Sequence, residues 1–184
     1  MDERQLRTSV MKGDPAAERA LYDRHVDGVF GLAYRMCGDE AMAEELTQDT
    51  FLRAFDRIGD WRAEAPFGAW LRAVSVSVVL NGLRKARRTR DRETLVADAE
   101  VLGRSVPADD LDLRRALDNA VEALPEDHRL VFVMHEMEGY THREIADALG
   151  TCVGTAKARL SRARTLLKLL LSGVLAGPNL ESEA

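Results

Sequence analysis

Hydrophobic residues recur along this chain of 184 residues at the three- and four-residue spacings that keep side chains on one face of an α-helix. A first stripe follows Pro15, which suits the first turn of a helix, and ends at Gly38. Its members are Tyr22, Val26, Val29, Ala33 and Met36. A second stripe runs towards Arg88 and contains Phe67, Leu71, Val74 and Val78. The two stripes predict an all-α fold.

One short segment inside the second stripe, residues 75–79, follows a different pattern. Its sequence Ser-Val-Ser-Val-Val alternates like a β-strand and is rich in β-branched residues. We nevertheless predict a helix, because only five residues alternate and no partner strand is visible elsewhere in the sequence. The residues from Leu83 to Lys85 also continue the helical pattern into a basic end.

The helix predicted over residues 40–58 differs from the others, because its apolar residues do not share one stripe. These residues are Leu46, Phe51, Leu52 and Phe55. Acidic and amide side chains lie between them, namely Glu44, Glu45, Gln48 and Asp49. A helix that is apolar on more than one side has more than one neighbour. Either another helix covers both sides, or the acidic and apolar part is left for an external partner.

The C-terminal third of the chain has the pattern of a helix-turn-helix. Thr141 and Glu144 have the spacing of a capping box, which marks a helix start. Gly150 then stands where a helix end requires a left-handed φ angle. A second helix is predicted from Val153 onwards. Its apolar stripe consists of Val153, Ala156, Leu160, Ala163 and Leu167.

The opposite face of this second helix combines small and cationic side chains. Ala158 lies at its centre, with Thr155, Ser161 and Arg162 beside it and Lys157, Arg159 and Arg164 at its flanks. Small side chains permit close approach to a DNA major groove, arginine can bind guanine bidentately, and flanking cations can bind phosphates. The alternative is an ordinary amphipathic helix whose basic side is solvated. Two capped helices across a glycine turn favour DNA binding.

Breaks in the pattern divide the chain into two small helical domains. Residues 1–15 are expected to form a loosely ordered N-terminal lead, and residues 16–88 the first domain. Residues 89–112 have weak periodicity, glycine, proline and several acids, which is typical of a flexible linker between domains. Residues 113–172 form the second domain, which ends in the helix-turn-helix. Residues 173–184 are expected to form a frayed tail.

A loop rich in aromatic residues, 60–70, joins the two helices of the first domain that follow residue 40. Aromatic side chains beside arginine can stack on unpaired bases, an interaction worth roughly 1–3 kcal/mol per base. We expect Phe67 and Trp70 to anchor the loop in the core. Trp61 is the better candidate for exposure.

Charge is segregated along the chain, although the net charge of −5 does not by itself indicate a nucleic-acid-binding protein. Residues 39–49 contain several acids and no base, whereas residues 84–92 contain arginines and a lysine against a single acid. Acid-only and base-only surfaces imply two different partners.

The sequence offers little for metal or catalytic chemistry. Cys37 and Cys152 cannot form a disulfide framework. His128, His135 and His142 recur every seventh residue, too far apart for the i, i+4 pairing of helical metal ligands. We expect no metal and no cofactor. Because no nucleophile-base pair or phosphate loop is found either, an enzyme is not expected.

We expect a cytoplasmic protein without a membrane span. The longest apolar run, residues 166–176, is shorter than the roughly 20 residues that cross a bilayer. The first 14 residues are polar and charged, which does not fit a secretory signal.

Four segments of the sequence resemble the extracytoplasmic-function (ECF) sigma factors of bacterial RNA polymerase. Residues 43–55 resemble the helix of the family's second region, and residues 65–71 the loop and helix start that follow it. Residues 124–129 and 154–164 resemble the fourth region. The segments occur in order and, with the expected linker, cover about residues 16–171. Each alone is weak evidence, but the set is specific.

The resemblance implies two partners, core RNA polymerase and promoter DNA, and an anti-sigma factor that covers the same surfaces. The β′ clamp coiled coil and the β flap would be the polymerase contacts, with Glu44, Glu45, Gln48, Asp49 and Leu52 on the clamp. The minus-ten element would be bound by Trp61, Arg62, Ser77, Asn81, Arg84, Lys85, Arg87 and Arg88. The minus-thirty-five element would be bound by Thr155, Lys157, Ala158, Arg159, Ser161 and Arg162.

Three positions depart from the family pattern. Val76-Ser77 stands where the family usually has Arg-Asn, which implies a weaker strand-melting contact. Cys152 stands where a serine commonly caps the recognition helix, and Ala156 replaces the usual valine. A second hypothesis is a stand-alone transcriptional regulator, which would need dimer symmetry to gain affinity from one helix-turn-helix.

Overall fold

Helices make up every regular element in the residues that the computed structural model describes, 3–93 and 113–175. This confirms the all-α prediction, including the helix over residues 75–79, where a strand pattern competed. The chain divides between Ala97 and Asp98 into two units, each with buried residues of its own.

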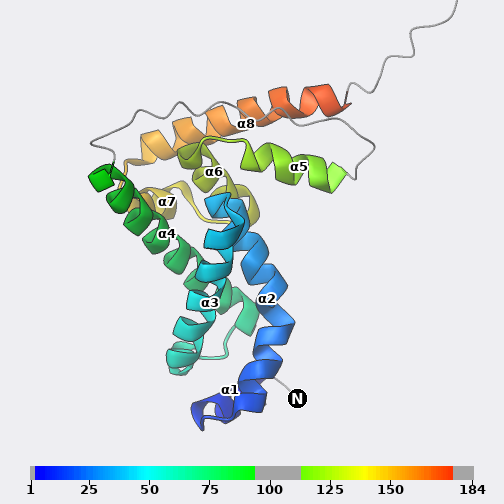
Figure 1. Ribbon diagram of the computed structural model, residues 1–184, viewed down its shortest axis with the longest axis vertical. Helices are drawn as coiled ribbons and strands as arrows, with labels where there is room; N and C mark the ends of the chain where they lie inside the picture. The colour runs from blue at the N-terminus through cyan, green and yellow to red at the C-terminus, as the bar shows by residue number, and fades with distance from the viewer. Residues whose placement is uncertain (1–2, 94–112, 176–184) are drawn as a thin grey trace, which may run out of the picture. The chain divides into compact units, whose positions relative to one another are not determined.

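The first unit is built on three helices, α2 (Pro15–Cys37), α3 (Glu40–Asp56) and α4 (Phe67–Glu93), which pack against one another (Figure 1). α2 starts as the sequence predicts, with Pro15 in its first turn and the Asp14 side chain accepting a hydrogen bond from the Ala16 amide. α4 continues to Glu93, so that residues 89–93 of the predicted linker are helical. The rest of that linker lies outside the described residues.

The core of the first unit consists of the predicted stripes and of the inner face of α3. Its largest fully buried side chains are Leu6, Leu21, Leu32, Met36, Phe67, Leu71 and Val79. Three buried hydroxyl groups, those of Thr47, Thr50 and Ser75, donate hydrogen bonds to carbonyl groups one turn earlier in their own helices. Because these hydroxyls are paired, their burial leaves no donor unsatisfied.

The N-terminal segment is a helix packed on this core, which corrects the expectation of a loosely ordered lead. α1 (Glu3–Met11) buries Leu6 and Val10, and it lies against α2 and against η1 (Ile58–Asp60), a 3₁₀ turn that follows α3. A helix this short is marginal in water, and one buried pair gives little periodicity. Packing on the rest of the unit therefore stabilises α1.

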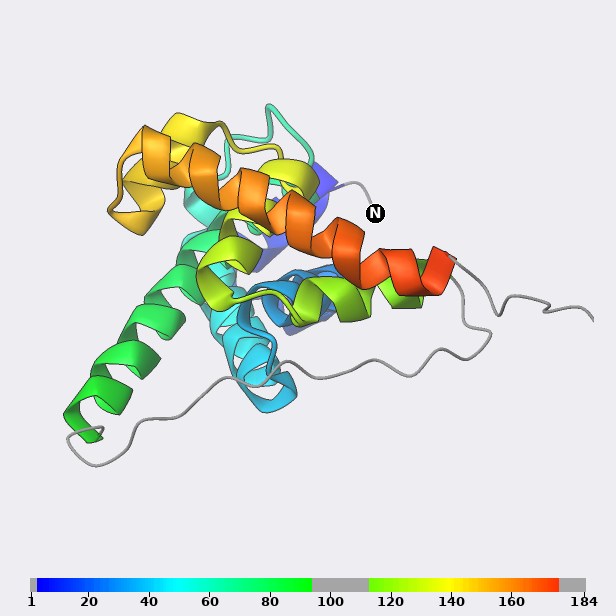
Figure 2. The ribbon, with the colours of Figure 1, turned by 90° about the horizontal axis from the view of Figure 1, so that it is seen from above.

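The second unit consists of α5 (Leu113–Glu122), α6 (Glu126–Phe132), the π-helical turn η2 (Val133–Met137), α7 (His142–Leu149) and α8 (Val153–Leu175). α8 packs against α5, α6 and α7, and Figure 2 shows it along its length as the helix that runs from orange to red. The residues after 175 in the predicted tail lie outside the described part of the chain.

The core of the second unit confirms most of the predicted stripe of α8. Ala156, Leu160, Ala163 and Leu167 are buried, and so are Val121, Val131, Val133, Met134 and Ile145 of the elements that come before α8. Val153 departs from the prediction, because it is the first residue of the helix and is 39% exposed. Arg129 is buried and donates hydrogen bonds to the carbonyls of Glu122 and Leu124, which stabilises the end of α5.

Within the two described ranges, no helix combines the length and the apolar character that crossing a membrane requires.

Candidate partner and nucleic-acid interfaces

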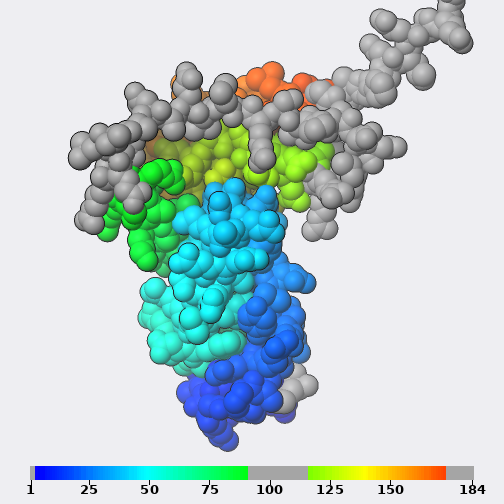
Figure 3. All heavy atoms as spheres, in the orientation of Figure 1, coloured from blue at the N-terminus to red at the C-terminus, as the bar shows by residue number. Residues whose placement is uncertain are grey.

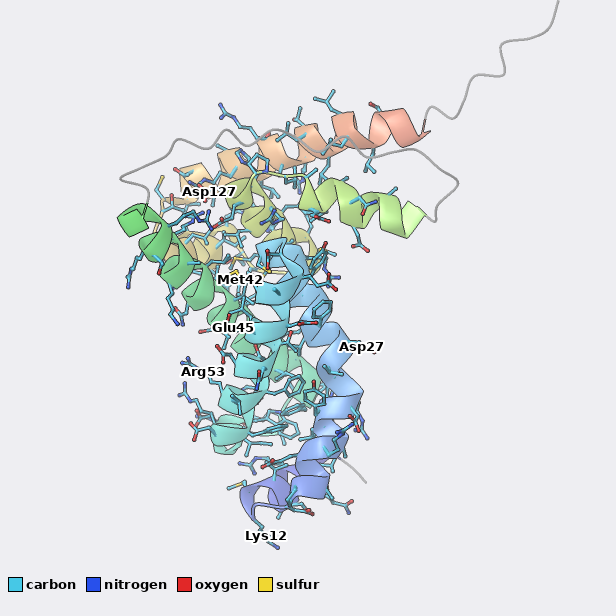
Figure 4. All side chains as sticks on the ribbon, in the orientation of Figure 1. Lys12, Asp27, Met42, Glu45, Arg53 and Asp127 are labelled. Atoms are coloured by element: carbon cyan, nitrogen blue, oxygen red, sulfur yellow. The ribbon has the colours of Figure 1, made fainter. Side chains whose placement is uncertain are left out.

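One face of α3 combines acidic side chains with an exposed leucine. Glu44, Glu45, Gln48 and Asp49 are exposed, and Leu52 is 61% exposed. Figure 3 shows the surface of α3 in cyan beside the blue surface of α2, and Figure 4 labels Glu45 on α3. The idea that another helix covers both sides of α3 is therefore wrong for Leu52 in the part of the chain that is described. The identity of the partner stays a prediction.

Two grooves flank this acidic face, and Leu52 lines both. The groove between α2 and α3 is mostly apolar and is lined by Tyr22, Val26, Phe30, Phe51 and Phe55, with the acids Glu18, Asp27 and Glu44. The groove between α3 and α4 includes Leu46, Asp49, Asn81 and Lys85. Phe30 is a site residue that was not predicted from the sequence. Its spacing could have indicated this, because Phe30 follows Val26 by four residues and therefore lies on the same side of the helix as Val26 and Tyr22.

The loop between α3 and α4, residues 57–66, holds Trp61 in the core. Trp61 is 3% exposed, its Nε1 donates a hydrogen bond to the Ala65 carbonyl at 2.9 Å, and its ring lies edge-on to Phe67 with centroids 5.2 Å apart. The expectation of an exposed Trp61 is therefore wrong. Burial is favoured because the indole has a large apolar area and its N–H is satisfied locally. Arg62, next in the chain, is exposed.

A small hollow between α3 and α4 brings Ser77 close to an aromatic ring and two cations. It is lined by Arg53, Arg57, Asp60, Trp70, Ala73, Val74 and Ser77. Ser77 is exposed, so it does not face the core, whereas Val76 is buried. Trp70 is half-buried rather than fully enclosed. Arg53, Arg57 and Trp70 were not predicted as site residues, because they come from three separate segments of the chain.

The basic end of α4 presents its predicted DNA-binding residues to solvent. Asn81, Arg84, Lys85, Arg87 and Arg88 are all exposed. The Arg84 side chain donates a hydrogen bond to Asn81 Oδ1 at 2.9 Å, which links two of these predicted residues one helical turn apart.

The joint of the helix-turn-helix has the predicted geometry. Glu144 Oε2 accepts a hydrogen bond from the Thr141 amide at 2.8 Å, and Thr141 Oγ1 accepts one from the Glu144 amide. Gly150 follows α7 with a φ of 64°. Cys152 precedes α8, and its Sγ lies 3.1 Å from Thr155 Oγ1. Hydrogen bonds from Thr155 lower the pKa of the Cys152 thiol.

The face of α8 opposite its buried stripe is open, as predicted. Lys157, Ala158, Ser161 and Arg162 are exposed, and Thr155 and Arg159 are half-buried. Nη2 of Arg159 lies 2.6 Å from Oδ2 of Asp127, which Figure 4 labels on α6. Arg164 pairs with Glu136 of η2. Two of the flanking cations predicted for DNA therefore form ion pairs within the unit, through acids 32 and 28 residues away in the chain.

Two histidines of the second unit are in contact, although they are seven residues apart in the sequence. The rings of His135 and His142 have centroids 4.4 Å apart, because the chain turns between η2 and α7. His135 Nδ1 lies 2.8 Å from the Tyr140 carbonyl, so we assign its proton to that nitrogen. Burial, followed by the charges of His135, Lys157 and Arg164, lowers the pKa of His142 against the opposing effect of Glu136.

Acidification is expected to destabilise the second unit through His142. Because the fold favours neutral His142, its contribution is complete above the ordinary histidine pKa of about 6.5 and is lost as the pH falls from there through the lowered pKa. Far-UV circular dichroism melts of the full chain from about pH 8 to about pH 5 would measure this. Fluorescence of Trp61 and Trp70, both in the first unit, follows that unit separately. Identical pH dependence in His142→Gln would contradict the prediction.

Comparison with known proteins gives the two units a common family. Residues 21–89 match Sigma-70 region 2, and residues 114–167 match Sigma-70, region 4. The chain is 33% identical over 168 residues to the ECF RNA polymerase sigma factor SigE of Mycolicibacterium smegmatis, covering 85% of this chain and 63% of that protein's length. It is also 33% identical over 173 residues to the ECF RNA polymerase sigma factor SigL of Mycobacterium tuberculosis, covering 88% of this chain and 94% of SigL.

A solved structure shows the same fold. The sigma factor RpoE of Bartonella quintana, crystallised in complex with the anti-sigma factor NepR, matches with a TM-score of 0.56 and 25% sequence identity, over 84% of this chain and 96% of that one. The two sigma-70 regions coincide with the two units in chain order, and SigL is matched over nearly its whole length. The chain therefore belongs to the extracytoplasmic-function sigma factors of the sigma-70 family.

Proposed function

We propose that this sigma factor divides promoter recognition among three surfaces. The acidic face of α3, with Leu52, binds the β′ clamp coiled coil of core RNA polymerase. The 57–66 loop and the basic end of α4 bind the minus-ten element, and the open face of α8 binds the minus-thirty-five element while its unit contacts the β flap. The protein acts in the cytoplasm and contributes specificity, with no catalysis of its own.

The observation that carries this proposal is the pair of oppositely charged surfaces. On α3, acids surround a leucine that is 61% exposed, a combination that suits a basic and partly apolar helix of another protein. On α4 and α8, exposed cations accompany small or polar side chains, a combination that suits phosphate and base edges. One partner could not satisfy both kinds of surface.

For the minus-ten element, Trp70 replaces Trp61 as the aromatic candidate. Trp70 is partly exposed, and it lines the hollow that also contains Arg53, Arg57 and Ser77. A base placed in this hollow could stack on the indole while a guanidinium neutralises its phosphate. We therefore assign the opened strand to the path between the 57–66 loop and Ser77.

Run-off transcription with purified core polymerase on genomic fragments tests the proposal. Discrete, promoter-specific transcripts that require this chain are expected. A protein that binds DNA as a dimer and yields no transcript with core polymerase would instead support the stand-alone regulator.

An anti-sigma factor is the further partner that we propose, because RpoE of Bartonella quintana was crystallised with one. Such a protein would compete for the acidic face of α3 and silence transcription. A candidate that binds the chain while leaving core binding unaffected would not fit this role.

The Ser77 position predicts a weak melting step. Ser77→Asn should raise open-complex yield on linear promoter DNA by about fivefold, because an amide reaches further than a hydroxyl and a hydrogen bond contributes roughly 1 kcal/mol. Permanganate reactivity of the opened thymines would measure the yield, with Ala69→Asn on an exposed position of the same helix as the matched control. Equal reactivity for wild type and Ser77→Asn would exclude Ser77 from melting.

A further inference from the structure

The N-terminal helix α1 makes polar contacts with the 57–66 loop through two arginines. Arg7 donates hydrogen bonds to the carbonyls of Ile58, at 3.3 Å, and Gly59, at 3.0 Å. Arg4 donates one to the carbonyl of Ala63 at 3.3 Å. These carbonyls lie more than 50 residues away in sequence, and they belong to the segment proposed to meet the minus-ten element. Charge-assisted hydrogen bonds of this kind are stronger than neutral ones.

A third side chain of α1 fixes the end of the loop. Glu3 Oε2 accepts a hydrogen bond from the Phe67 amide at 3.0 Å, where α4 begins. The first amides of a helix have no partner within it, and a carboxylate there satisfies one and favours the helix dipole. The other oxygen of Glu3 lies 3.9 Å from Nε2 of His25. Glu3 therefore acts as a helix cap supplied from 64 residues away.

The loop itself has an unusual backbone at the point that Arg4 contacts. Ala63 has a φ of 57°, and it is the one non-glycine residue with a positive φ in the described ranges. Residues with a β-carbon rarely adopt this conformation, and they keep it only where the surroundings impose it. Here the surroundings are Arg4 on the Ala63 carbonyl and the Trp61 ring anchored on Phe67.

Apolar packing joins α1 to the same place. Leu6 and Val10 belong to one buried cluster with Ile58, Trp61 and Phe67. α1 is thus attached to the loop in three ways. Its apolar side chains pack with those of the loop, and Arg7 and Glu3 form hydrogen bonds at the two ends of the loop. Arg4 binds the carbonyl of Ala63, the loop residue with the positive φ. Figure 1 shows α1 at the end of the first unit, where the chain passes from α3 to α4.

We propose that α1 is a positioning element for promoter opening, in which Glu3, Arg4 and Arg7 hold the 57–66 loop in the conformation that receives the minus-ten strand. The proposal rests on the function proposed above for that loop. The three side chains act on backbone groups of the loop, so they are positioning residues rather than DNA contacts. Their loss lowers affinity for the opened strand and leaves attachment to core polymerase intact.

The experiment measures binding of the holoenzyme to a fork-junction DNA that presents the minus-ten strand unpaired. Arg4→Ala and Arg7→Ala should each weaken this binding by about fivefold to tenfold, as expected for the loss of charge-assisted hydrogen bonds, with core affinity unchanged. Glu3→Gln should weaken it less, because its amide oxygen still accepts from Phe67. Lys12→Ala, an exposed cation just after α1 (Figure 4), is the control and should have no effect.

Rescue separates positioning from direct contact with DNA. Glycine adopts a positive φ without strain, so Ala63→Gly should restore most of the binding lost in Arg4→Ala. If Arg4 contacted a phosphate directly, Ala63→Gly would restore nothing, and the positioning role would be wrong.

In the free protein, a Trp70→Phe background leaves Trp61 as the sole indole. Its emission should shift to the red in Arg4→Ala and Arg7→Ala, because a looser loop brings the buried indole into contact with water.

Arg62→Ala distinguishes failure of this inference from failure of the proposed function. If Arg62→Ala weakens fork binding but the α1 variants do not, the loop binds DNA and α1 does not position it. If neither Arg62→Ala nor the α1 variants weaken it, the loop does not meet the minus-ten strand, and both the minus-ten role of the loop and the positioning role of α1 are wrong.

Discussion

Reversing Glu45 and Asp49 together to lysine is expected to lower the affinity for core RNA polymerase by about a hundredfold or more. The change removes two negative charges and places two positive charges against a basic partner, and disrupting close interfacial charge pairs costs about 2–5 kcal/mol. Both side chains are exposed, so the fold should not change. Leu52→Ala should weaken the same binding, because a leucine that is 61% exposed in the free chain would be buried by the partner. Fluorescence anisotropy with labelled sigma factor and purified core polymerase would measure the core affinity of the wild type, of the double reversal and of Leu52→Ala.

Asp23→Lys is the matched control for charge reversal. Asp23 is an exposed acid of α2, and its ion pair with Arg19 is a surface pair that contributes little to stability. Its reversal changes the net charge as much as either single reversal on α3, and it should leave core affinity nearly unchanged. Asp49→Lys alone, measured in the same assay, is the single reversal with which it is compared. If Asp23→Lys lowers core affinity as much as Asp49→Lys, net charge rather than the face of α3 controls binding.

Arg162→Ala is expected to relax promoter specificity at one base position of the minus-thirty-five element, with a loss of about 1–3 kcal/mol for the preferred base. The reason is geometric, since Arg162 is exposed on the side of α8 opposite its buried stripe, where a guanidinium can bind a base edge bidentately. Lys157→Ala should weaken binding evenly across sequences, because a flanking ammonium meets the backbone. Holoenzyme binding to a set of single-base variants would show the difference.

Lys168→Ala, which removes an exposed cation further along α8, controls for the loss of charge alone. Should Arg162→Ala weaken binding equally for every base variant, as a phosphate contact would, the base-reading assignment would be withdrawn.

The elements whose pattern is local were predictable from the sequence. The stripe of α8, the capping box of Thr141 and Glu144 and the turn at Gly150 depend on residues within a few positions of one another, and all are present except for Val153 at the start of the stripe. The uncovered part of α3 was predictable for the same reason. Its acids and Leu52 are interleaved at spacings that a single inward stripe cannot bury.

The errors arose where distant segments decide the outcome. Trp61 was expected to be exposed, but Phe67 and the packing of α1 enclose it. α1 itself was missed because its two buried residues gain their significance only from a core formed later in the chain. The hollow around Ser77 was missed for a related reason, since its cations come from α3 and the 57–66 loop and its ring from α4. No periodicity within one segment could have assembled these groups.

The two ion pairs of α8 also bear on how ionic strength acts on the promoter complex. Each phosphate that a protein cation neutralises releases condensed counterions, which adds about −0.9 to the slope of log K against log salt. Counting the three flanking cations Lys157, Arg159 and Arg164 alike would give about −2.7 from this face, whereas counting only Lys157 gives about −0.9. Because Asp127 and Glu136 already hold Arg159 and Arg164, the lower figure is expected, and minus-thirty-five binding should tolerate salt better than the row of cations suggests.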